Sequence, residues 1–151
     1  MAIRNIVTER NEILRKKSRP ITDFNEKLWN LLDDMAQTMY KAGGVGLAAV
    51  QVGILRQAVV VDIGDGLIEL VNPQIAEQNG ENIDTEGCLS CPGEYGKVKR
   101  PSYVKVKAFD RNGNPIELEA KDFLARAFCH EIDHLQGTIF KDLAIEMVDI
   151  K

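Results

Sequence analysis

His130-Glu131-Ile132-Asp133-His134 is the stretch on which the interpretation of the whole chain depends. Its two histidines are the only ones among 151 residues, and a glutamate directly follows the first. Residues i and i+4 lie on the same face of a helix, so both imidazoles can bind one metal ion, with the glutamate near its open coordination positions. The alternative is two surface histidines on an exposed helix. The pattern favours a metal site of the kind that hydrolytic enzymes use.

The composition excludes several classes of protein. Hydrophobic residues make up 44% and charged residues 28%, as in ordinary globular proteins, and the length predicts a single catalytic domain, residues 1–151. The net charge of −4 argues against direct nucleic-acid readout and against a polybasic membrane surface. No apolar run reaches the roughly 20 residues that cross a bilayer, and the first residues lack the apolar stretch of a secretory signal. We therefore expect a cytoplasmic protein without a membrane partner.

Local charge and cysteine content add little to this picture. The basic segments 15–19 and 97–100 are interpreted as solvated loop charges. The three cysteines are an odd number, so they do not indicate a disulfide framework in a chain of this size. In a reducing compartment such thiols are available as metal ligands or as small buried hydrophobes.

Two helices are predicted. The first covers residues 24–42, with Asp23 as N-cap, Glu26 completing a capping box and Gly43 ending the helix. Its apolar positions recur at helical spacing and predict one buried stripe. The second helix covers residues 122–136, ends at Gly137 and carries both histidines. The stripe of the first helix consists of Leu28, Leu31, Leu32, Met35 and Met39.

The segment between the first helix and the first strand is rich in glycine and small residues. A phosphate-binding loop is not expected there, because residues 43–53 contain no lysine and lack a strand-turn-helix context. Small residues permit close approach of the backbone to a ligand or to a neighbouring element. Gln51 is the lone polar side chain in this apolar run, and it is either a satisfied core amide or a donor directed into a site.

The middle of the chain predicts strands and turns. Residues 57–63 and 67–71 form a predicted strand pair, which Pro73 ends or places at an edge. Residues 78–87 are polar and predict a loop. A second hairpin pairs residues 103–109 with residues 115–119. The predicted fold is therefore α+β, and no internal repeat or linker divides it.

The third metal ligand decides the class of the site, since a catalytic site needs three protein ligands and one open position. Glu146 is only twelve residues past His134, which leaves little room for another ligand-bearing helix, and Phe140 stands where a metzincin has its third histidine. Cys88 is then the obvious soft donor. Cys91 raises the alternative of a closed structural Cys2His2 site. Against that alternative, 38 residues lie between Cys91 and His130, far more than in a zinc finger.

Three motifs together resemble the signature of the peptide deformylases. They are Gly44-Val45-Gly46-Leu47-Ala48-Ala49-Val50-Gln51, Glu86-Gly87-Cys88-Leu89-Ser90 and the pentapeptide of residues 130–134, in the order and approximate spacing of that family. The resemblance spans nearly the whole chain and departs from the commoner pattern at residues 91–95. It implies antiparallel sheets packed around a central metal-binding helix, with a helix near the N-terminus. It also implies removal of the formyl group from the formylmethionine of nascent peptides, possession of one divalent ion, and a ribosome-linked setting.

The resemblance also implies roles for individual residues. The metal ligands are Cys88, His130 and His134, and the expected ion is Fe²⁺, which Zn²⁺, Ni²⁺ or Co²⁺ can replace. Glu131 is the general acid-base, and the Gln51 amide and the Leu89 backbone N–H are donors to the developing oxyanion. Gly46 pairs with the substrate backbone, and Glu86 with Arg100 forms a supporting ion pair.

Positions on the second helix suggest the substrate pocket. Phe123 and Ala127 lie on roughly the same helix face as His130 and, with Val45, would suit the unbranched side chain of methionine. Plain helix packing is the alternative for both. Arg126, at the edge of this face, is interpreted as a solvated or ion-paired side chain. The rival functions are a metalloprotease or amidase of broader specificity, read from the pentapeptide alone, and a metal-stabilised binding module without chemistry.

Overall fold

We describe the fold from a computed structural model, which describes residues 2–149. The predicted α+β class is confirmed: two long helices combine with eight strands in the described part of the chain. The helical elements are η1 (Glu12–Arg15), α1 (Glu26–Lys41), η2 (Ala49–Val52), α2 (Asp122–His134) and α3 (Phe140–Leu143). The strands are β1 (Gly46–Ala48), β2 (Ala58–Val61), β3 (Ile68–Asn79), β4 (Asn82–Cys88), β5 (Cys91–Arg100), β6 (Tyr103–Phe109), β7 (Pro115–Lys121) and β8 (Glu146–Val148).

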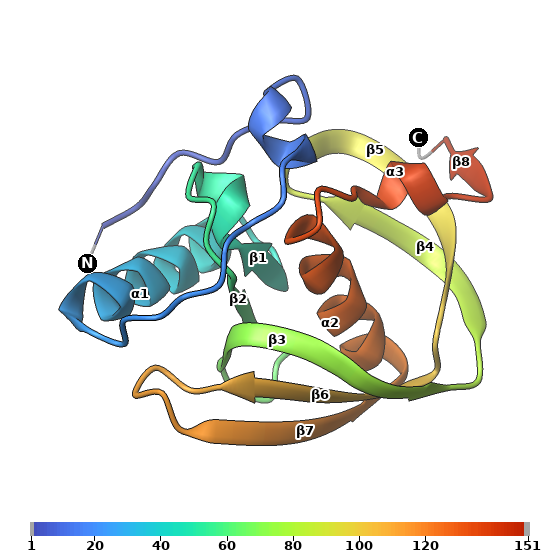
Figure 1. The fold of residues 1–151 in the computed structure, drawn as a ribbon. Helices are drawn as coiled ribbons and strands as arrows, with labels where there is room; N and C mark the ends of the chain where they lie inside the picture. Colours follow the sequence, from blue (N-terminus) through green and yellow to red (C-terminus); the bar gives the residue numbers. More distant parts are fainter. Residues whose placement is uncertain (1, 150–151) are drawn as a thin grey trace.

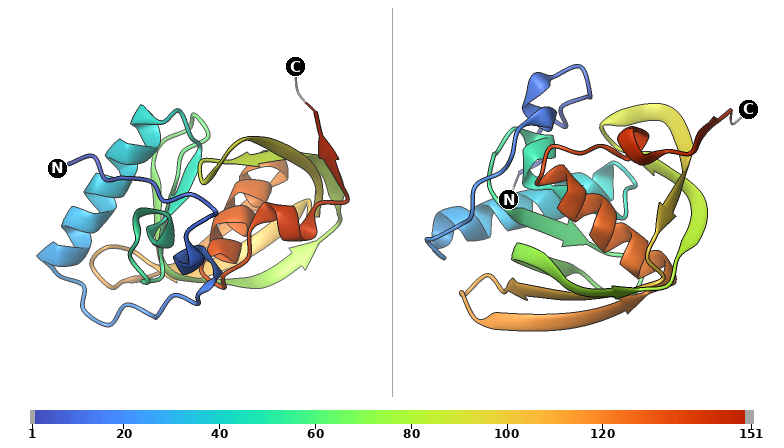
Figure 2. Two further views of the ribbon diagram at one scale, coloured as in Figure 1. Left: turned by 90° about the horizontal axis from the view of Figure 1, so that it is seen from above. Right: turned by 45° about the vertical axis from the view of Figure 1, so that its right-hand side comes forward.

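The strands form two antiparallel sheets. One has the order β1-β2-β3-β6-β7 and the other the order β4-β5-β8. Helix α2 runs through the middle, with β3, β6 and β7 on one side and the β4–β5 hairpin on another (Figure 1). Helix α1 lies apart from α2, across β1 and β2 (Figure 2). The predicted arrangement of antiparallel sheets around a central helix is confirmed.

Helix α1 buries the predicted apolar stripe. All five of its leucine and methionine positions are buried, and they pack with residues of β1 and β2 in one hydrophobic cluster. The predicted N-cap was wrong by two residues: Asn25, not Asp23, caps the helix, and its side chain accepts a hydrogen bond from Leu28 N at 3.3 Å. Asn and Asp are equally good N-caps, so composition could not separate the two positions.

Helix α2 is buried along most of its length and ends at His134, two residues before the predicted end. Gly137 follows it with φ +80°, and a Cβ there would lie 2.5 Å from the carbonyl oxygen of Arg15. Glycine is therefore required at this position for two reasons: its positive φ, and the close approach of the N-terminal segment. This contact sets how the chain leaves the helix that carries both histidines.

One prediction for the middle of the chain was wrong. Residues 78–87 are not a loop, because they complete β3 and form most of β4, which pairs with β5. In β4 only Glu86 is buried, so no apolar alternation marked the strand. As predicted, the pairing of β2 with β3 ends at Val71, two residues before Pro73, although β3 itself continues to Asn79. The pairing of β3 with β6 shifts register between Val71 and Gln74, where a residue without an N–H is tolerated.

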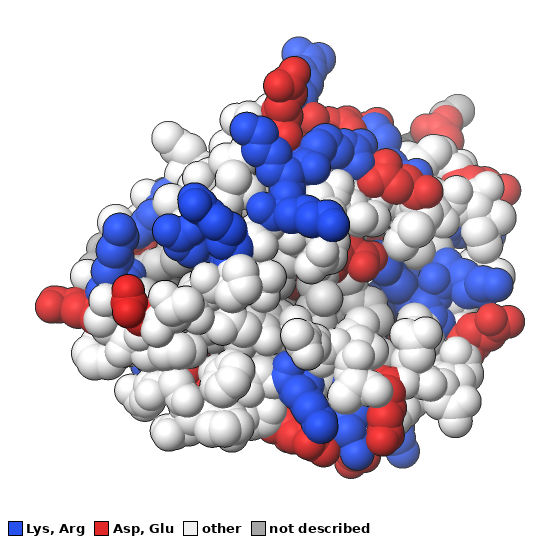
Figure 3. All heavy atoms as spheres, viewed as in Figure 1, with Lys and Arg blue, Asp and Glu red and all other residues white. Residues whose placement is uncertain are grey.

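The charged surface agrees with the predictions in one segment and not in another. Lysine and arginine side chains gather over the upper part of the face in Figure 3, and Lys16 and Lys17 are exposed as expected. Residues 97–100 are strand rather than loop. Lys97 and Lys99 are exposed, but Arg100 is buried, which corrects its interpretation as a solvated charge. Within residues 2–149, no helix has the length and apolar character to span a bilayer.

Candidate metal centre

Cys88, His130 and His134 converge on one point from two elements. Cys88 ends β4, while the histidines lie one turn apart on α2. One donor atom of each lies within 4.8 Å of the others, and Cys88 Sγ is 3.4 Å from His134 Nε2. Ligands bound to one tetrahedral zinc-sized ion are about 3.5 Å apart, given typical metal–sulfur and metal–nitrogen bonds. The three side chains therefore fit a single divalent ion.

The electrostatics of these three side chains are also compatible with a bound cation. Burial, and then the charges of His130 and Arg100, hold the pKa of His134 well below its usual value, so its imidazole is neutral and able to bind a metal. The pKa of Cys88 is raised by its hydrogen bond with Cys91, by burial and by the charge of Glu131. A bound cation would reverse this effect, because it stabilises the thiolate directly.

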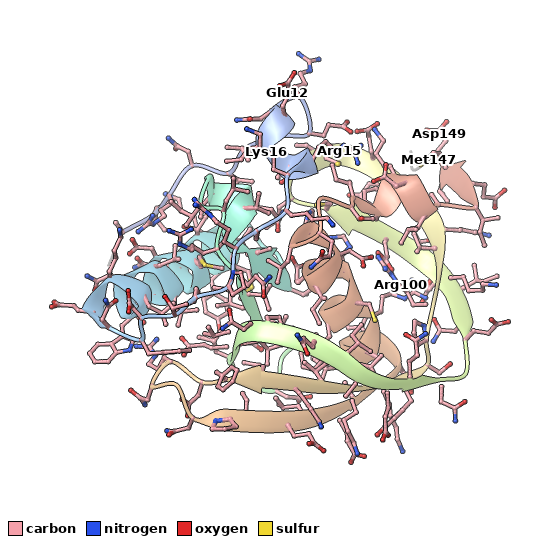
Figure 4. The ribbon with its side chains drawn as sticks, in the orientation of Figure 1. Glu12, Arg15, Lys16, Arg100, Met147 and Asp149 are labelled. Carbon is pink, nitrogen blue, oxygen red and sulfur yellow. The ribbon has the colours of Figure 1, made fainter. Side chains whose placement is uncertain are left out.

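A buried carboxylate orients the first histidine. Glu86 Oε1 lies 2.9 Å from His130 Nδ1, and Arg100 donates to both carboxylate oxygens at 2.8 and 2.9 Å. Burial alone would raise the pKa of Glu86, but hydrogen bonds from Arg100 and His130 lower it to about 2. An ionised carboxylate only accepts hydrogen bonds, so Nδ1 carries the proton and His130 Nε2 keeps the lone pair that binds a metal. Figure 4 shows Arg100 between α2 and the β4–β5 hairpin.

Glu131 is buried beside His130, and a glycine makes room for it. Its Oε2 lies 4.0 Å from His130 Nε2, while its Oε1 is buried without a hydrogen-bond partner among the described residues. Burial raises the pKa of Glu131 to about 7. A Cβ at Gly46 would lie 2.5 Å from Glu131 Oε2, so any other residue there would displace this carboxylate. Glu131 is also among the residues that line the cavity described below.

Gln51 is both a satisfied core amide and a donor directed at the site. Its Oε1 accepts a hydrogen bond from Ala48 N at 2.9 Å, and this bond fixes which end of the amide faces Cys88. Its Nε2 lies 3.1 Å from Ser90 Oγ and 3.5 Å from Cys88 Sγ. Leu89 follows Cys88 in the turn between β4 and β5. The structure therefore places both predicted oxyanion donors next to the thiol.

The predicted site residues surround one cavity of about 370 Å³. Val45 and Phe123 are 41% and 52% exposed and line its mouth, while Ala127 is buried in its wall. His134 is fully buried behind the cavity and is the one predicted site residue that does not line it. The lining shared with the prediction comprises Val45, Gly46, Gln51, Cys88, Leu89, Phe123, Ala127, His130 and Glu131.

Cys91 belongs to a different group of donors. Its thiol lies within 4.8 Å of carboxylate oxygens of Glu9 and Glu94. The ammonium of Lys141 already lies 2.9 Å from both carboxylates and neutralises them. In the described part of the chain, Cys91 is not in the group formed by Cys88 and the two histidines. This arrangement does not support a closed Cys2His2 site.

Sequence reasoning missed three residues of this network. Ser90 fixes the Gln51 amide, Asp133 binds Arg100 NH1 at 2.5 Å, and Arg126 binds Glu86. Arg126 was interpreted as solvated or ion-paired; it is ion-paired and buried. Ser90 and Asp133 lie inside the quoted motifs, which was the available signal, whereas nothing in the sequence pairs Arg126 with Glu86.

Known proteins resemble this chain over almost its full length. The family described as Polypeptide deformylase matches residues 3–148. A peptide deformylase of Thermoanaerobacter pseudethanolicus is 55% identical over 99% of this chain and 94% of its own length. The peptide deformylase of Acetivibrio thermocellus is 56% identical over 99% of this chain and 88% of its own length.

Solved structures agree with the sequence relatives. A Legionella pneumophila peptide deformylase has a TM-score of 0.91 and 45% identity, covering 93% of this chain and 85% of that one. A Synechococcus elongatus peptide deformylase, solved in complex with actinonin, has a TM-score of 0.90 and 39% identity, covering 93% and 78%. With the geometry of the site, these matches show that the chain belongs to the polypeptide deformylase family.

Proposed function

We propose that the cavity at Glu131 is where this chain performs the reaction of its family. That reaction is hydrolysis: the enzyme removes the N-formyl group from nascent peptides and depends on a divalent metal. The observation that carries the assignment to this cavity is the convergence of Cys88, His130 and His134 within 4.8 Å beside a buried glutamate. The alternative function, a metalloprotease of broad specificity, would need an acidic side chain as third ligand, whereas the third side chain beside the two histidines is Cys88.

The proposed ligands of the ion are the Cys88 thiolate and the Nε2 atoms of His130 and His134. When bound there, a divalent ion supplies Lewis acidity, which makes water a nucleophile near neutral pH. A thiolate with two imidazoles suits soft and borderline ions rather than Mg²⁺ or Ca²⁺. We propose Fe²⁺ as the ion in the cell, with Zn²⁺, Ni²⁺ or Co²⁺ as replacements. Metal analysis of protein purified without oxygen tests this identity.

The remaining chemistry falls to three groups of the chain. Glu131 accepts the proton of the attacking water and returns it to the departing amine nitrogen, which yields formate and a free N-terminus. Its unpartnered Oε1 is free to hold that proton. Gln51 Nε2 and the Leu89 N–H donate to the formyl oxygen as negative charge develops on it. Because Ala48 and Ser90 fix the amide of Gln51, this donor is oriented before the substrate arrives.

The walls of the cavity suit an extended peptide that begins with methionine. Among residues 2–149, strand β1 lies at the edge of its sheet and pairs only with β2, so the other side of Gly46 is available to a substrate backbone. Val45, Phe123 and Ala127 offer apolar surface of the kind an unbranched side chain fills. We assign these four residues to substrate binding.

The setting of the reaction follows from its substrate. Formylated N-termini arise during translation, so we propose that the chain acts in the cytoplasm on nascent N-formylmethionyl peptides, near the ribosome. We further propose that residues 1–151 form a single catalytic domain, in keeping with the central position of α2 between the two sheets.

A substrate panel tests the function directly. The purified holoenzyme is expected to release formate from formyl-Met-Ala-Ser, and neither to remove the acetyl group of acetyl-Met-Ala-Ser nor to cut an unblocked internal peptide. Glu131→Gln with metal bound should lose the activity. Cleavage of internal peptides would favour the broad protease, and full activity of Glu131→Gln would refute the proposed role of this residue.

A further inference from the structure

Arg126 lies one helical turn before His130 and shares its buried face of α2. Side chains at i and i+4 of a helix lie one above the other, so the guanidinium reaches the same carboxylate that orients the histidine. Only 4% of Arg126 is exposed, although arginine is seldom buried without partners. Its burial therefore needs an explanation in the groups it contacts.

The guanidinium of Arg126 joins three elements. Its NH1 donates to Glu86 Oε2 at 2.5 Å and to the carbonyl of Val98 at 2.9 Å. Its NH2 donates to the carbonyl of Asn82 at 3.1 Å and to the side-chain oxygen of the same residue. Asn82 and Glu86 belong to β4 and Val98 to β5, so one side chain ties α2 to both strands of the hairpin.

Two arginines, Arg100 and Arg126, donate hydrogen bonds to the carboxylate of Glu86. Oε1 binds His130 Nδ1 and Arg100, while Oε2 binds Arg100 and Arg126. Arg100 is also bound to Asp133. The two arginines therefore balance the two carboxylates, and Arg126 is the one whose other bonds all go to backbone or amide oxygens of the hairpin. It fixes the carboxylate relative to the backbone.

We propose that Arg126 is a positioning residue of the metal site, which acts through Glu86 to hold the His130 ring in its metal-binding orientation. This inference rests on the metal-dependent function proposed above. Without Arg126, Glu86 loses its link to β4 and β5, and the carbonyls of Asn82 and Val98 lose a buried donor. Arg100, which is itself bound to Asp133, is then the only arginine that positions the Glu86 carboxylate. The His130 imidazole that is hydrogen-bonded to this carboxylate is then less rigidly oriented.

The chain offers a matched control for this test in Arg111. It binds Glu69 at 2.6 and 2.9 Å and Asp33 at 2.8 Å, and none of these three residues lines the cavity. Arg126→Met and Arg111→Met each remove one such arginine and keep a side chain of similar length. Zn²⁺ affinity, measured by competition with a chromogenic chelator, and the visible absorption of the Co²⁺-loaded protein report the ligand geometry.

Arg126→Met is expected to weaken Zn²⁺ binding about tenfold, toward the lower end of the roughly 10–100-fold typical of groups that support a ligand. It should also change the Co²⁺ spectrum. Arg111→Met should lower the melting temperature but leave both metal readouts as in wild type. Wild-type Zn²⁺ affinity in Arg126→Met, or an equal loss in Arg111→Met, would overturn the proposal.

Arg126→Lys keeps the test decisive if the methionine variant does not fold. Lysine retains the charge but cannot bind Glu86 and both carbonyls together, so we expect a Zn²⁺ affinity between those of wild type and the methionine variant. An affinity equal to that of wild type in Arg126→Lys would count against the proposal. Formate release by the wild-type holoenzyme is measured in parallel. Its absence would refute the proposed function, whereas the Zn²⁺ readouts judge Arg126 by themselves.

Discussion

Helices α1 and α2 each bury one face, but the two faces carry different kinds of side chain. The core-facing stripe of α1 is apolar, and only Asp34 and Thr38 are buried polar positions on it. Helix α2 buries apolar residues too, but its inner face also holds Arg126, Glu131 and both histidines. Burying charges costs free energy unless they are paired. The buried face of α1 therefore mainly stabilises the fold, whereas the buried face of α2 also holds polar groups that cost stability and are available for chemistry.

The largest expected effect comes from neutralising the unpartnered carboxylate on α2. Glu131→Gln should reduce kcat for formyl-Met-Ala-Ser about 10²–10⁴-fold, the usual contribution of a general base. The unfolding free energy should not fall, because the substitution removes a buried charge without a partner at Oε1. Steady-state kinetics and urea denaturation of the metal-loaded protein test the two halves together. A loss of stability as large as the loss of activity would contradict the division between the helices.

The oriented amide of Gln51 should matter next. Gln51→Met is expected to reduce kcat about 10²–10³-fold, as loss of one oxyanion donor does in other enzymes. Ala48 N also loses its buried acceptor, so a stability loss of about 1–3 kcal/mol is expected as well. Kinetics at a temperature well below unfolding separate the two effects. Wild-type kcat in this variant would remove Gln51 from the proposed mechanism.

A cavity created under the buried face of α1 should lower stability and leave catalysis unchanged. Leu32 is fully buried, so Leu32→Ala is expected to cost about 2–5 kcal/mol of unfolding free energy while kcat per folded molecule stays unchanged. The matched control is Leu143→Ala, which changes a leucine that is 45% exposed and should shift stability by no more than about 0.5 kcal/mol. Denaturation curves and active-site titration give both quantities. A drop in kcat per folded Leu32→Ala molecule would show that the two helices are coupled.

The smallest effect concerns the one buried acid of α1. Burial raises the pKa of Asp34, but the hydrogen bonds from Ala2 N at 2.7 Å and Arg4 outweigh burial and lower it. A lowered folded-state pKa stabilises the fold above the unfolded value of about 3.9, and this stability is lost as pH falls through the folded-state pKa.

Asp34→Asn should therefore melt below wild type at pH 7, and the gap should close below about pH 4. Asp65→Asn, at an exposed turn, is the control and should match wild type at both pH values. Thermal melts across this pH range test the prediction. A gap that stays constant down to pH 3 would show that the Asp34 charge is not what stabilises the contact.

The fold could be predicted from sequence where one face of an element is apolar. The stripe of α1 and the alternation of apolar and polar residues in β6 predicted those elements, because burial selects hydrophobic residues with the period of the element. The turn at residues 110–113 then predicted β7 as the returning strand. Strand β4 could not be predicted. Its only buried side chain is Glu86, and its backbone is satisfied by β5, a partner that local sequence does not reveal.

In the candidate site, too, some residues could be predicted from the sequence and others could not. The three expected ligands and Glu131 lie in motifs whose spacing reflects chemistry, and the structure brings all four together. The groups that hold them come from distant parts of the chain: Arg126 reaches Glu86, forty positions away, and Ser90 reaches Gln51. Such pairings depend on tertiary folding, so no local pattern encodes them.

The central claim is that the thiolate of Cys88, and not that of Cys91, binds the same ion as the two histidines. Near-ultraviolet absorption of the Co²⁺-loaded protein tests it most directly, because a thiolate ligand gives a sulfur-to-cobalt charge-transfer band. The band should be lost in Cys88→Ala and retained in Cys91→Ala, a matched change only three residues away. A band that survives Cys88→Ala, or disappears in Cys91→Ala, would contradict the claim.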